Sequence, residues 1–145
     1  MSVKRGFSLV ELVVVIMILG ILAAVAAPKL LNTSATATDN GLKESLAVVR
    51  NAIELYSAEH EGTLPGASSN DETIFKADLA PYLRGTFPEC PVGAKNAEVK
   101  VSNGASALSG QANPSKAWAY SRKTGEFIVN YSAASSDSVT TYDKF

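Results

Sequence analysis

The hydrophobic pattern of the chain changes at Pro28. Residues 7–27 (FSLVELVVVIMILGILAAVAA) are apolar almost without interruption. A helix of about 21 residues, at 1.5 Å rise per residue, is long enough to cross roughly 30 Å of hydrocarbon. Farther along, apolar residues recur at spacings of four, three, four and three, which predicts one face of an amphipathic helix; they are Leu42, Leu46, Val49, Ile53 and Tyr56.

The two patterns together predict one long helix that continues after Pro28 to about His60. Gly62 lies where a glycine commonly follows the end of a helix. Such a helix would span roughly 80 Å, apolar on all sides in its first half and amphipathic in its second. Only lipid or other copies of the chain can cover the first half, so the pattern favours a protein that forms filaments.

Residues 63–145 read as a small α/β region. A short helix is expected near residues 69–81, because Ser69 and Glu72 have the S-x-x-E spacing of a helix start. Alternating patterns predict three strands, at residues 97–102, 116–121 and 126–132. The expected fold class is therefore α+β, with the long helix packed on a small antiparallel sheet.

One sheet face is expected to carry the core of this region. Four large side chains alternate with a period of two along the last two strands, as on one face of a sheet; they are Trp118, Tyr120, Phe127 and Val129. Residues 122–125 (RKTG) form a natural hairpin connection, in which Gly125 can adopt a positive φ.

The apolar N-terminal run has three conventional interpretations. It could be a secretory signal peptide, with Lys4–Arg5 as the basic region and Ala24-Val25-Ala26 as a cleavage site. It could be a simple transmembrane anchor. It could be a buried core helix, but about 115 further residues bury one small core and cannot surround so long a helix.

Glu11 argues against the signal-peptide and simple-anchor interpretations. A carboxylate inside an apolar membrane helix costs on the order of 2.5 kcal/mol or more, and a passive anchor has no use for it. An ionisable residue there indicates a function and a partner. If the chain is cut after Gly6, the new α-ammonium of Phe7 lies one helical turn from Glu11. The two charges, in one chain or in neighbouring copies, would relieve each other's cost.

Residues 4–11 (KRGFSLVE), followed by the apolar run, resemble the class III leader of type IV pilins and type II secretion pseudopilins. In that family, prepilin peptidase cleaves after the glycine, here Gly6, and methylates the new first residue, here Phe7. The resemblance assigns Glu11 to the registration of subunits during assembly. It implies a leader at residues 1–6, an assembly helix at 7–28, its amphipathic continuation at 29–62 and a globular region at 63–145.

Gly20 and Pro28 also match the family pattern. Glycine is unfavourable inside a helix, and Pro28 removes the hydrogen bond to the carbonyl of Ala24. The two residues therefore bracket a segment that could loosen or kink, as pilins that resemble this chain do in filaments. The alternative is that they only bend a transmembrane helix, in which both residue types are frequent.

Residues 90–93 (CPVG), with Trp118-Ala119-Tyr120 and Gly125, resemble the globular part of type II secretion pseudopilins. Major pseudopilins bind calcium near the C-terminus, and Asp137 and Asp143 are the weak candidates for this ion here, since calcium prefers oxygen ligands. The alternative is a solvated, mobile Ser-rich tail, so no cofactor is expected apart from this calcium. Cys90 cannot form a disulfide within the chain, because it is the only cysteine; it is expected to be a structural thiol.

Composition and charge exclude several other functions. No nucleophile elbow, phosphate loop or zinc-spaced cluster is present, and His60, the only histidine, is expected to be a helix-end group, so no enzyme is expected. Without Lys4 and Arg5, 11 basic residues oppose 14 acidic ones, which gives a net charge of −3. That balance disfavours nucleic-acid binding, although Arg122–Lys123 is a small basic patch.

The expected function is that of a filament subunit, most simply a secretion pseudopilin. The alternative is a major or minor type IV pilin for adhesion, motility or DNA uptake. The expected partners are other copies, other pilins or pseudopilins, prepilin peptidase and an inner-membrane assembly platform. Lys4–Arg5 should stay cytoplasmic, with the globular part in the periplasm before incorporation into a periplasmic or extracellular filament.

Overall fold

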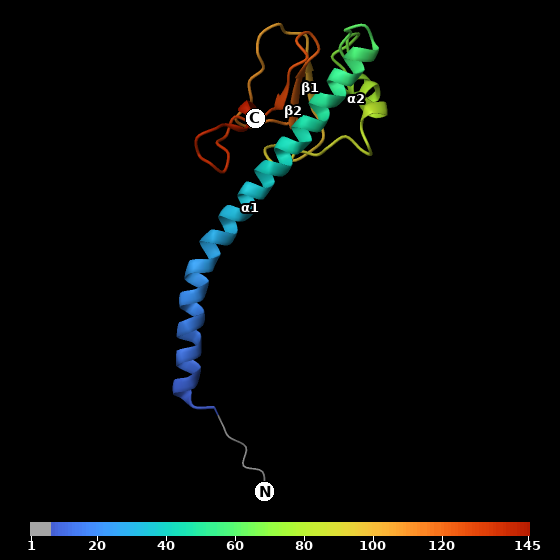
Figure 1. Ribbon diagram of the computed structural model, residues 1–145. Helices are drawn as coiled ribbons and strands as arrows, with labels where there is room; N and C mark the ends of the chain where they lie inside the picture. The colour runs from blue at the N-terminus through green and yellow to red at the C-terminus, as the bar shows by residue number, and fades with distance from the viewer. Residues whose placement is uncertain (1–6) are drawn as a thin grey trace. The chain divides into compact units, whose positions relative to one another are not determined.

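The computed structural model describes residues 7–145, and its longest element is helix α1, Leu9–Glu59 (Figure 1). The predicted leader, residues 1–6, lies outside the described residues. The chain forms two compact units, one ending at Thr36 and the other running from Ala37 to Phe145. α1 contributes to both, and its buried side chains begin at Asp39.

The helix continues without interruption through Gly20 and Pro28. It ends at Glu59, where the chain turns through two positive φ angles, 55° at Glu61 and 84° at Gly62. The Gly62 N–H donates to the Ser57 carbonyl at 2.8 Å, which satisfies one of the carbonyls that a helix end leaves open. The predicted single helix, with its end just before Gly62, is confirmed.

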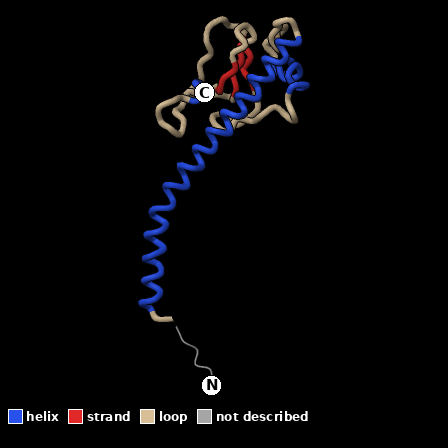
Figure 2. The backbone as a smooth tube through the Cα atoms, viewed as in Figure 1, coloured by secondary structure: helices blue, strands red, loops and turns tan. Residues whose placement is uncertain are grey.

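The globular unit adds one further α-helix, two short 3₁₀ helices and a three-stranded sheet (Figure 2). The elements after α1 are α2 (Glu72–Leu79), η1 (Ala80–Tyr82), β1 (Val99–Ser102), β2 (Trp118–Ser121), β3 (Phe127–Val129) and η2 (Tyr142–Lys144). All three predicted strands are present, each shorter than its sequence pattern. The α+β fold class is confirmed.

The sheet is mixed, whereas the sequence pattern predicted an antiparallel one. β2 and β3 pair antiparallel through the expected hairpin, with Tyr120 opposite Phe127. β1 and β2 pair parallel, with Val99 opposite Trp118. The connection at residues 103–117 is long enough to carry the chain back to the start of the sheet, which a parallel pair requires.

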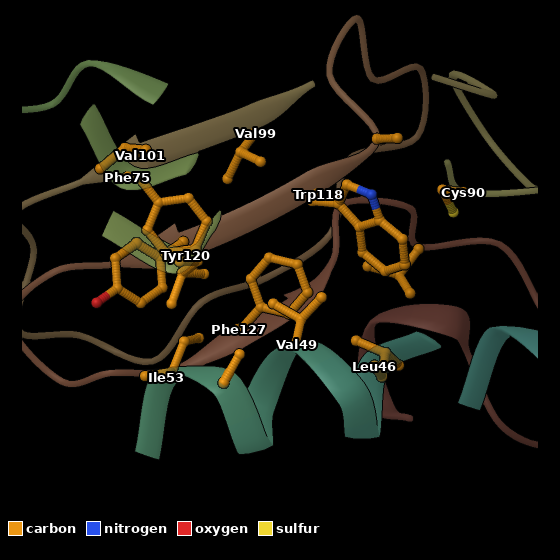
Figure 3. Packing of buried hydrophobic residues seen from close by; sticks show 14 of the residues in the cluster. Leu46, Val49, Ile53, Phe75, Cys90, Val99, Val101, Trp118, Tyr120 and Phe127 are labelled. Atoms are coloured by element: carbon orange, nitrogen blue, oxygen red, sulfur yellow. The ribbon is translucent and has the colours of Figure 1, made fainter. Parts of the chain in front are cut away.

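The core lies between the buried face of α1 and one face of the sheet (Figure 3). Leu42, Leu46, Val49 and Ile53 are all at most 2% exposed, so the predicted helical face is confirmed. On the sheet, the Trp118 ring stacks on Phe127 with ring centres 5.2 Å apart, and the Tyr120 ring stacks on Phe75 of α2 at 4.2 Å.

Polar atoms of the core aromatics are hydrogen-bonded to loops. The Trp118 Nε1–H donates to the Pro88 carbonyl at 3.0 Å, and the Tyr120 hydroxyl donates to the Pro65 carbonyl at 3.1 Å. These bonds satisfy the polar atoms of the two buried rings, which would be costly if unpaired. They also tie the rings to the loops that contain Pro65 and Pro88.

α2 begins at Glu72, two residues later than an N-cap at Ser69 would place its start. Asp71, and not Ser69, is the N-cap, because its carboxylate accepts from the Thr73 N–H at 2.8 Å. Ser69 instead accepts from the Asp71 N–H at 3.2 Å. The capping role assigned to Ser69 and Glu72 was wrong, since Glu72 makes long-range contacts.

On each outer strand, one backbone group is hydrogen-bonded to a side chain from a helix. Glu72 Oε2 accepts from the Val99 N–H of β1 at 2.9 Å and from Lys116 Nζ at 2.7 Å. At the other edge, the Arg50 Nε–H of α1 donates to the Phe127 carbonyl of β3 at 3.0 Å.

Candidate assembly site

The first unit presents an apolar helical surface in its described residues. Side chains of residues 7–36 are all exposed, including Phe7 at 86%. By length and composition, this part of α1 could cross a membrane. Because apolar surface is unfavourable in water, the segment requires lipid or other protein around it.

Glu11 is the only ionisable residue in the run 7–27, and its carboxylate turns back toward the start of the helix. Its Oε2 accepts from the Ser8 N–H at 3.0 Å, while Ser8 Oγ accepts from the Val10 N–H at 3.3 Å. This reciprocal arrangement is a capping box, which explains why α1 begins at Leu9. The S-x-x-E spacing of residues 8–11 is visible in the sequence, but the sequence reasoning overlooked it.

The geometry at the start of α1 bears on the predicted cleavage site. Phe7 is described, and Gly6 lies outside the described residues. The Ser8 nitrogen that Glu11 accepts from is one residue from the Phe7 nitrogen, which would become the α-ammonium after cleavage. Within residues 7–145, no ion pair reaches Glu11. Its pairing with an ammonium group stays a prediction.

Polar side chains after Pro28 are turned onto the helix backbone. Thr33 Oγ1 donates to the Lys29 carbonyl at 2.9 Å, and Thr36 Oγ1 donates to the Asn32 carbonyl at 3.0 Å. Each hydroxyl thus has its donor satisfied within the helix. This stretch can enter an apolar environment without leaving those donors unpaired. Loosening between Gly20 and Pro28 stays a prediction.

The C-terminal acidic residues are held by donors of the protein itself. Asp137 is exposed, and its Oδ1 accepts from the N–H groups of Thr140 and Val139 and from the Ser135 hydroxyl, each at 2.8 Å. These hydrogen bonds hold the pKa of Asp137 well below its usual range.

Asp143 is buried and has different neighbours. Burial by itself would raise the pKa of Asp143, but the Thr141 hydroxyl and the Gly110 N–H, at 2.5 and 3.0 Å, hold it below its usual value. Within residues 7–145, no three Asp, Glu, His or Cys side chains gather as metal ligands. Calcium binding at Asp137 and Asp143 stays a prediction, and both carboxylates accept hydrogen bonds from the protein in this structure.

Cys90 and His60 have structural surroundings. Cys90 is a free thiol, 1% exposed, and burial raises its pKa, so it lies in the core as a weakly reactive group. The His60 ring stacks on Tyr56 with centres 4.0 Å apart, and its Nδ1 lies 2.8 Å from the Tyr56 carbonyl. His60 lies at the end of α1, as expected.

Comparison with known proteins gives relatives for most of the chain. A family model, the prokaryotic N-terminal methylation motif, matches residues 1–27. Competence protein ComGC of Halalkalibacterium halodurans is 31% identical over 106 residues, which are 73% of this chain and 92% of that protein.

Two further relatives match over shorter stretches. Type II secretion system core protein G of Escherichia coli K12 is 27% identical over 84 residues, 58% of this chain and 57% of that protein, so the match spans little more than half of that relative. The type IV narrow pilus major component PilA5 of Thermus thermophilus is 34% identical over 58 residues, 40% of this chain and 50% of that protein. No solved structure matches the chain.

Proposed function

The chain belongs to the family of type IV pilins and type II secretion pseudopilins, and from this premise we propose that it is a secretion pseudopilin. It is a membrane-anchored, pilin-like subunit of a filament, and it acts as a structural protein and not as an enzyme. In this proposal prepilin peptidase removes residues 1–6 and methylates Phe7. An inner-membrane platform then assembles the subunits.

The observation that carries the proposal is the position of Glu11 in an otherwise apolar, uncovered helix. Its carboxylate already faces the start of the helix, where cleavage would create the Phe7 ammonium. In a bundle of copies, that ammonium and a carboxylate can pair away from water, where opposite charges attract more strongly than in solvent. The pairing would set the axial position of each copy against its neighbours.

The topology follows from the charges at the N-terminus. Lys4 and Arg5 precede the apolar run and favour a cytoplasmic start. The globular unit then lies in the periplasm. The chain without residues 1–6 has a net charge of −3, from 11 basic and 14 acidic residues. A subunit of this charge is suited to a scaffold more than to binding nucleic acid.

A competence pilus is the second candidate, because the ComGC relative is matched over 92% of its length. Such a subunit would serve DNA uptake as part of the filament, without necessarily contacting DNA itself. Deletion of the gene separates the two candidates. Loss of protein secretion with normal DNA uptake supports the pseudopilin, and the reverse result supports the competence pilin.

The first test of the proposed function is the intact mass of the protein purified from its own membranes. We expect a mass that corresponds to residues 7–145 plus one methyl group. A mass that corresponds to residues 27–145 or 28–145 would mean that signal peptidase removes the apolar run. A mass of the full 145 residues would contradict processing.

A further inference from the structure

The turn at residues 135–140 presents an apolar tip on a rigid base. The Ser135 N–H donates to the Thr140 carbonyl at 2.8 Å, and Asp137 Oδ1 accepts the three hydrogen bonds described above. Val139, at the tip, is 87% exposed, the largest exposure of any large apolar side chain in residues 7–145. The turn is held from within, so its shape does not depend on the Val139 side chain.

A hollow of about 250 Å³ lies between α1 and the loop at residues 83–88. Its apolar lining includes Val48, Leu83 and Pro88, and Val48 is 47% exposed. Gly41 also lines it, and a Cβ atom there would meet no atom of the chain within 4 Å. Glycine destabilises a helix interior, and no contact within the chain requires it at this position. Gly41 places no side chain in the hollow.

The hollow carries one acidic and one basic exposed side chain, Glu44 and Arg84, and the tip carries the carboxylate of Asp137 beside it. Asp137 is a carboxylate two residues from Val139, with its Oδ1 bonded to the turn. Arg84 lines the hollow and is exposed, and within residues 7–145 it has no hydrogen bond or ion pair. A valine entering the hollow would bring a carboxylate toward an unpaired guanidinium, the pairing that Arg favours.

The tip and the hollow are formed by different residues of the globular unit, the tip by the turn at residues 135–140 and the hollow by α1 and the loop at residues 83–88. Figure 1 shows the turn at residues 135–140, drawn in red, on the left of α1. When two different patches on one subunit are complementary, copies join head to tail. If the rotation between successive copies does not close a ring, the contact repeats along an open filament. This is the type of contact that a filament needs.

We propose that Val139 of one copy inserts into the hollow lined by Gly41, Val48, Leu83 and Pro88 of the next copy, with Asp137 facing Arg84. The partner is therefore a second copy of this chain. The proposal rests on the proposed function as a filament subunit, and it adds a contact between globular units to the contact between apolar helices.

Cysteine cross-linking in assembled filaments tests the contact. In a Cys90→Ala background, Val139→Cys with Val48→Cys places one thiol on the tip and one in the hollow of every copy. Under mild oxidation we expect a ladder of dimers, trimers and longer chains on a non-reducing gel. Val139→Cys with Leu55→Cys is the control, since Leu55 is 54% exposed on α1 but does not line the hollow. Equal ladders in both variants would overturn the proposal.

Substitutions at the two patches give an independent readout. Val139→Asp and Arg84→Glu should each lower the filament yield about tenfold or more, because a charge is placed in an apolar contact or opposite a like charge. Processing at Gly6 and the melting temperature of the monomer should stay unchanged. Lys123→Glu, an exposed basic residue outside the hollow, is the matched charge control and should assemble normally.

The outcomes separate the two proposals. Normal assembly of Val139→Asp would overturn insertion of the tip and leave the filament function intact. If the processed, unaltered chain forms no filaments, the proposed function fails, and the contact between copies fails with it.

Discussion

Glu11 has the Ser8 N–H as its partner at the start of α1, and the proposed function adds a second partner that makes a different demand on its side chain. The capping bond to the Ser8 N–H needs an acceptor oxygen, which a neutral amide also provides. Pairing with an α-ammonium in a filament needs the negative charge. Capping alone would make Glu11 a local helix-start residue, whereas the proposed function requires the charge.

Two substitutions separate these roles. Glu11→Gln should keep helix capping and membrane insertion but lower the filament yield about tenfold or more, since an ammonium would lose its counter-charge. Glu11→Leu should insert at least as well and assemble as poorly. Filament yield by sedimentation or microscopy, normalised to membrane-bound subunit, measures the effect. Normal assembly of Glu11→Gln with failure of Glu11→Leu would reduce Glu11 to a cap.

Prediction of single residues from the sequence succeeded where a hydrophobic pattern is compatible with only one structure. The face that includes Leu42, Leu46 and Val49 is buried as predicted, because a helical period leaves only one side for the core. Caps were less predictable. Ser69 and Asp71 are both residue types that favour an N-cap. Asp71 is the N-cap here, and the Glu72 side chain contacts residues distant in the sequence, which the local pattern does not reveal. The match to the family confirms the resemblance that residues 4–11 indicated.

Among the elements, α2 is joined to the sheet by the buried Phe75 ring and also by polar contacts of Glu72. Its carboxylate contacts Lys76 at 3.3 Å, Lys116 at 2.7 Å and the Val99 N–H at 2.9 Å. Burial by itself would raise the pKa of Glu72, but these hydrogen bonds and nearby positive charges lower it from 4.5. The ionised side chain therefore stabilises the fold.

Glu72→Gln should destabilise the globular unit in a pH-dependent way. A carboxyl with a lowered folded-state pKa stabilises the protein above its unfolded pKa, and that contribution is lost as the pH falls through the folded value. We expect the variant to be less stable by about 1 kcal/mol near pH 7, or roughly 4 °C in melting temperature.

The difference between the two proteins should shrink toward zero below about pH 4. Denaturant unfolding across pH 3–7 measures it. A difference that stays constant over this range would contradict the role of the Glu72 charge. Glu98→Gln, a second acidic residue near β1 without these partners, is the control and should change little.

The order of the strands was the least predictable feature at the scale of elements. The hairpin between β2 and β3 follows from local turn chemistry around Gly125, with its φ of 76°. The pairing of β1 depends on the path of residues 103–117, which contain no strand and little hydrophobic pattern. A period of two predicts that β1 is a strand and gives no information on its direction.

At the scale of the molecule, the core belongs entirely to the unit that starts at Ala37. Its buried apolar residues run from Leu42 to Val129, and every side chain of residues 7–36 is exposed. Folding of the globular unit should therefore not require the apolar segment. Assembly, in contrast, should depend on that segment.

A chain of residues 29–145, which retains all of the core, should be soluble and unfold in one cooperative transition. We expect its melting temperature to lie within a few degrees of that of the full chain in detergent, because the lost residues bury nothing in the fold. It should form no filaments at concentrations where the processed chain does. Differential scanning calorimetry and electron microscopy check both points. A molten fragment would show that the apolar segment contributes to folding.

The outer strands have a further consequence for a protein that must polymerise. Open strand edges at high local concentration template cross-β aggregates, and a filament packs its subunits at such concentration. Glu72 and Arg50 each occupy an outward-facing backbone group, on Val99 and on Phe127 respectively. Removing either side chain should therefore expose a strand-edge backbone group to other copies, and cross-β pairing there would compete with ordered growth.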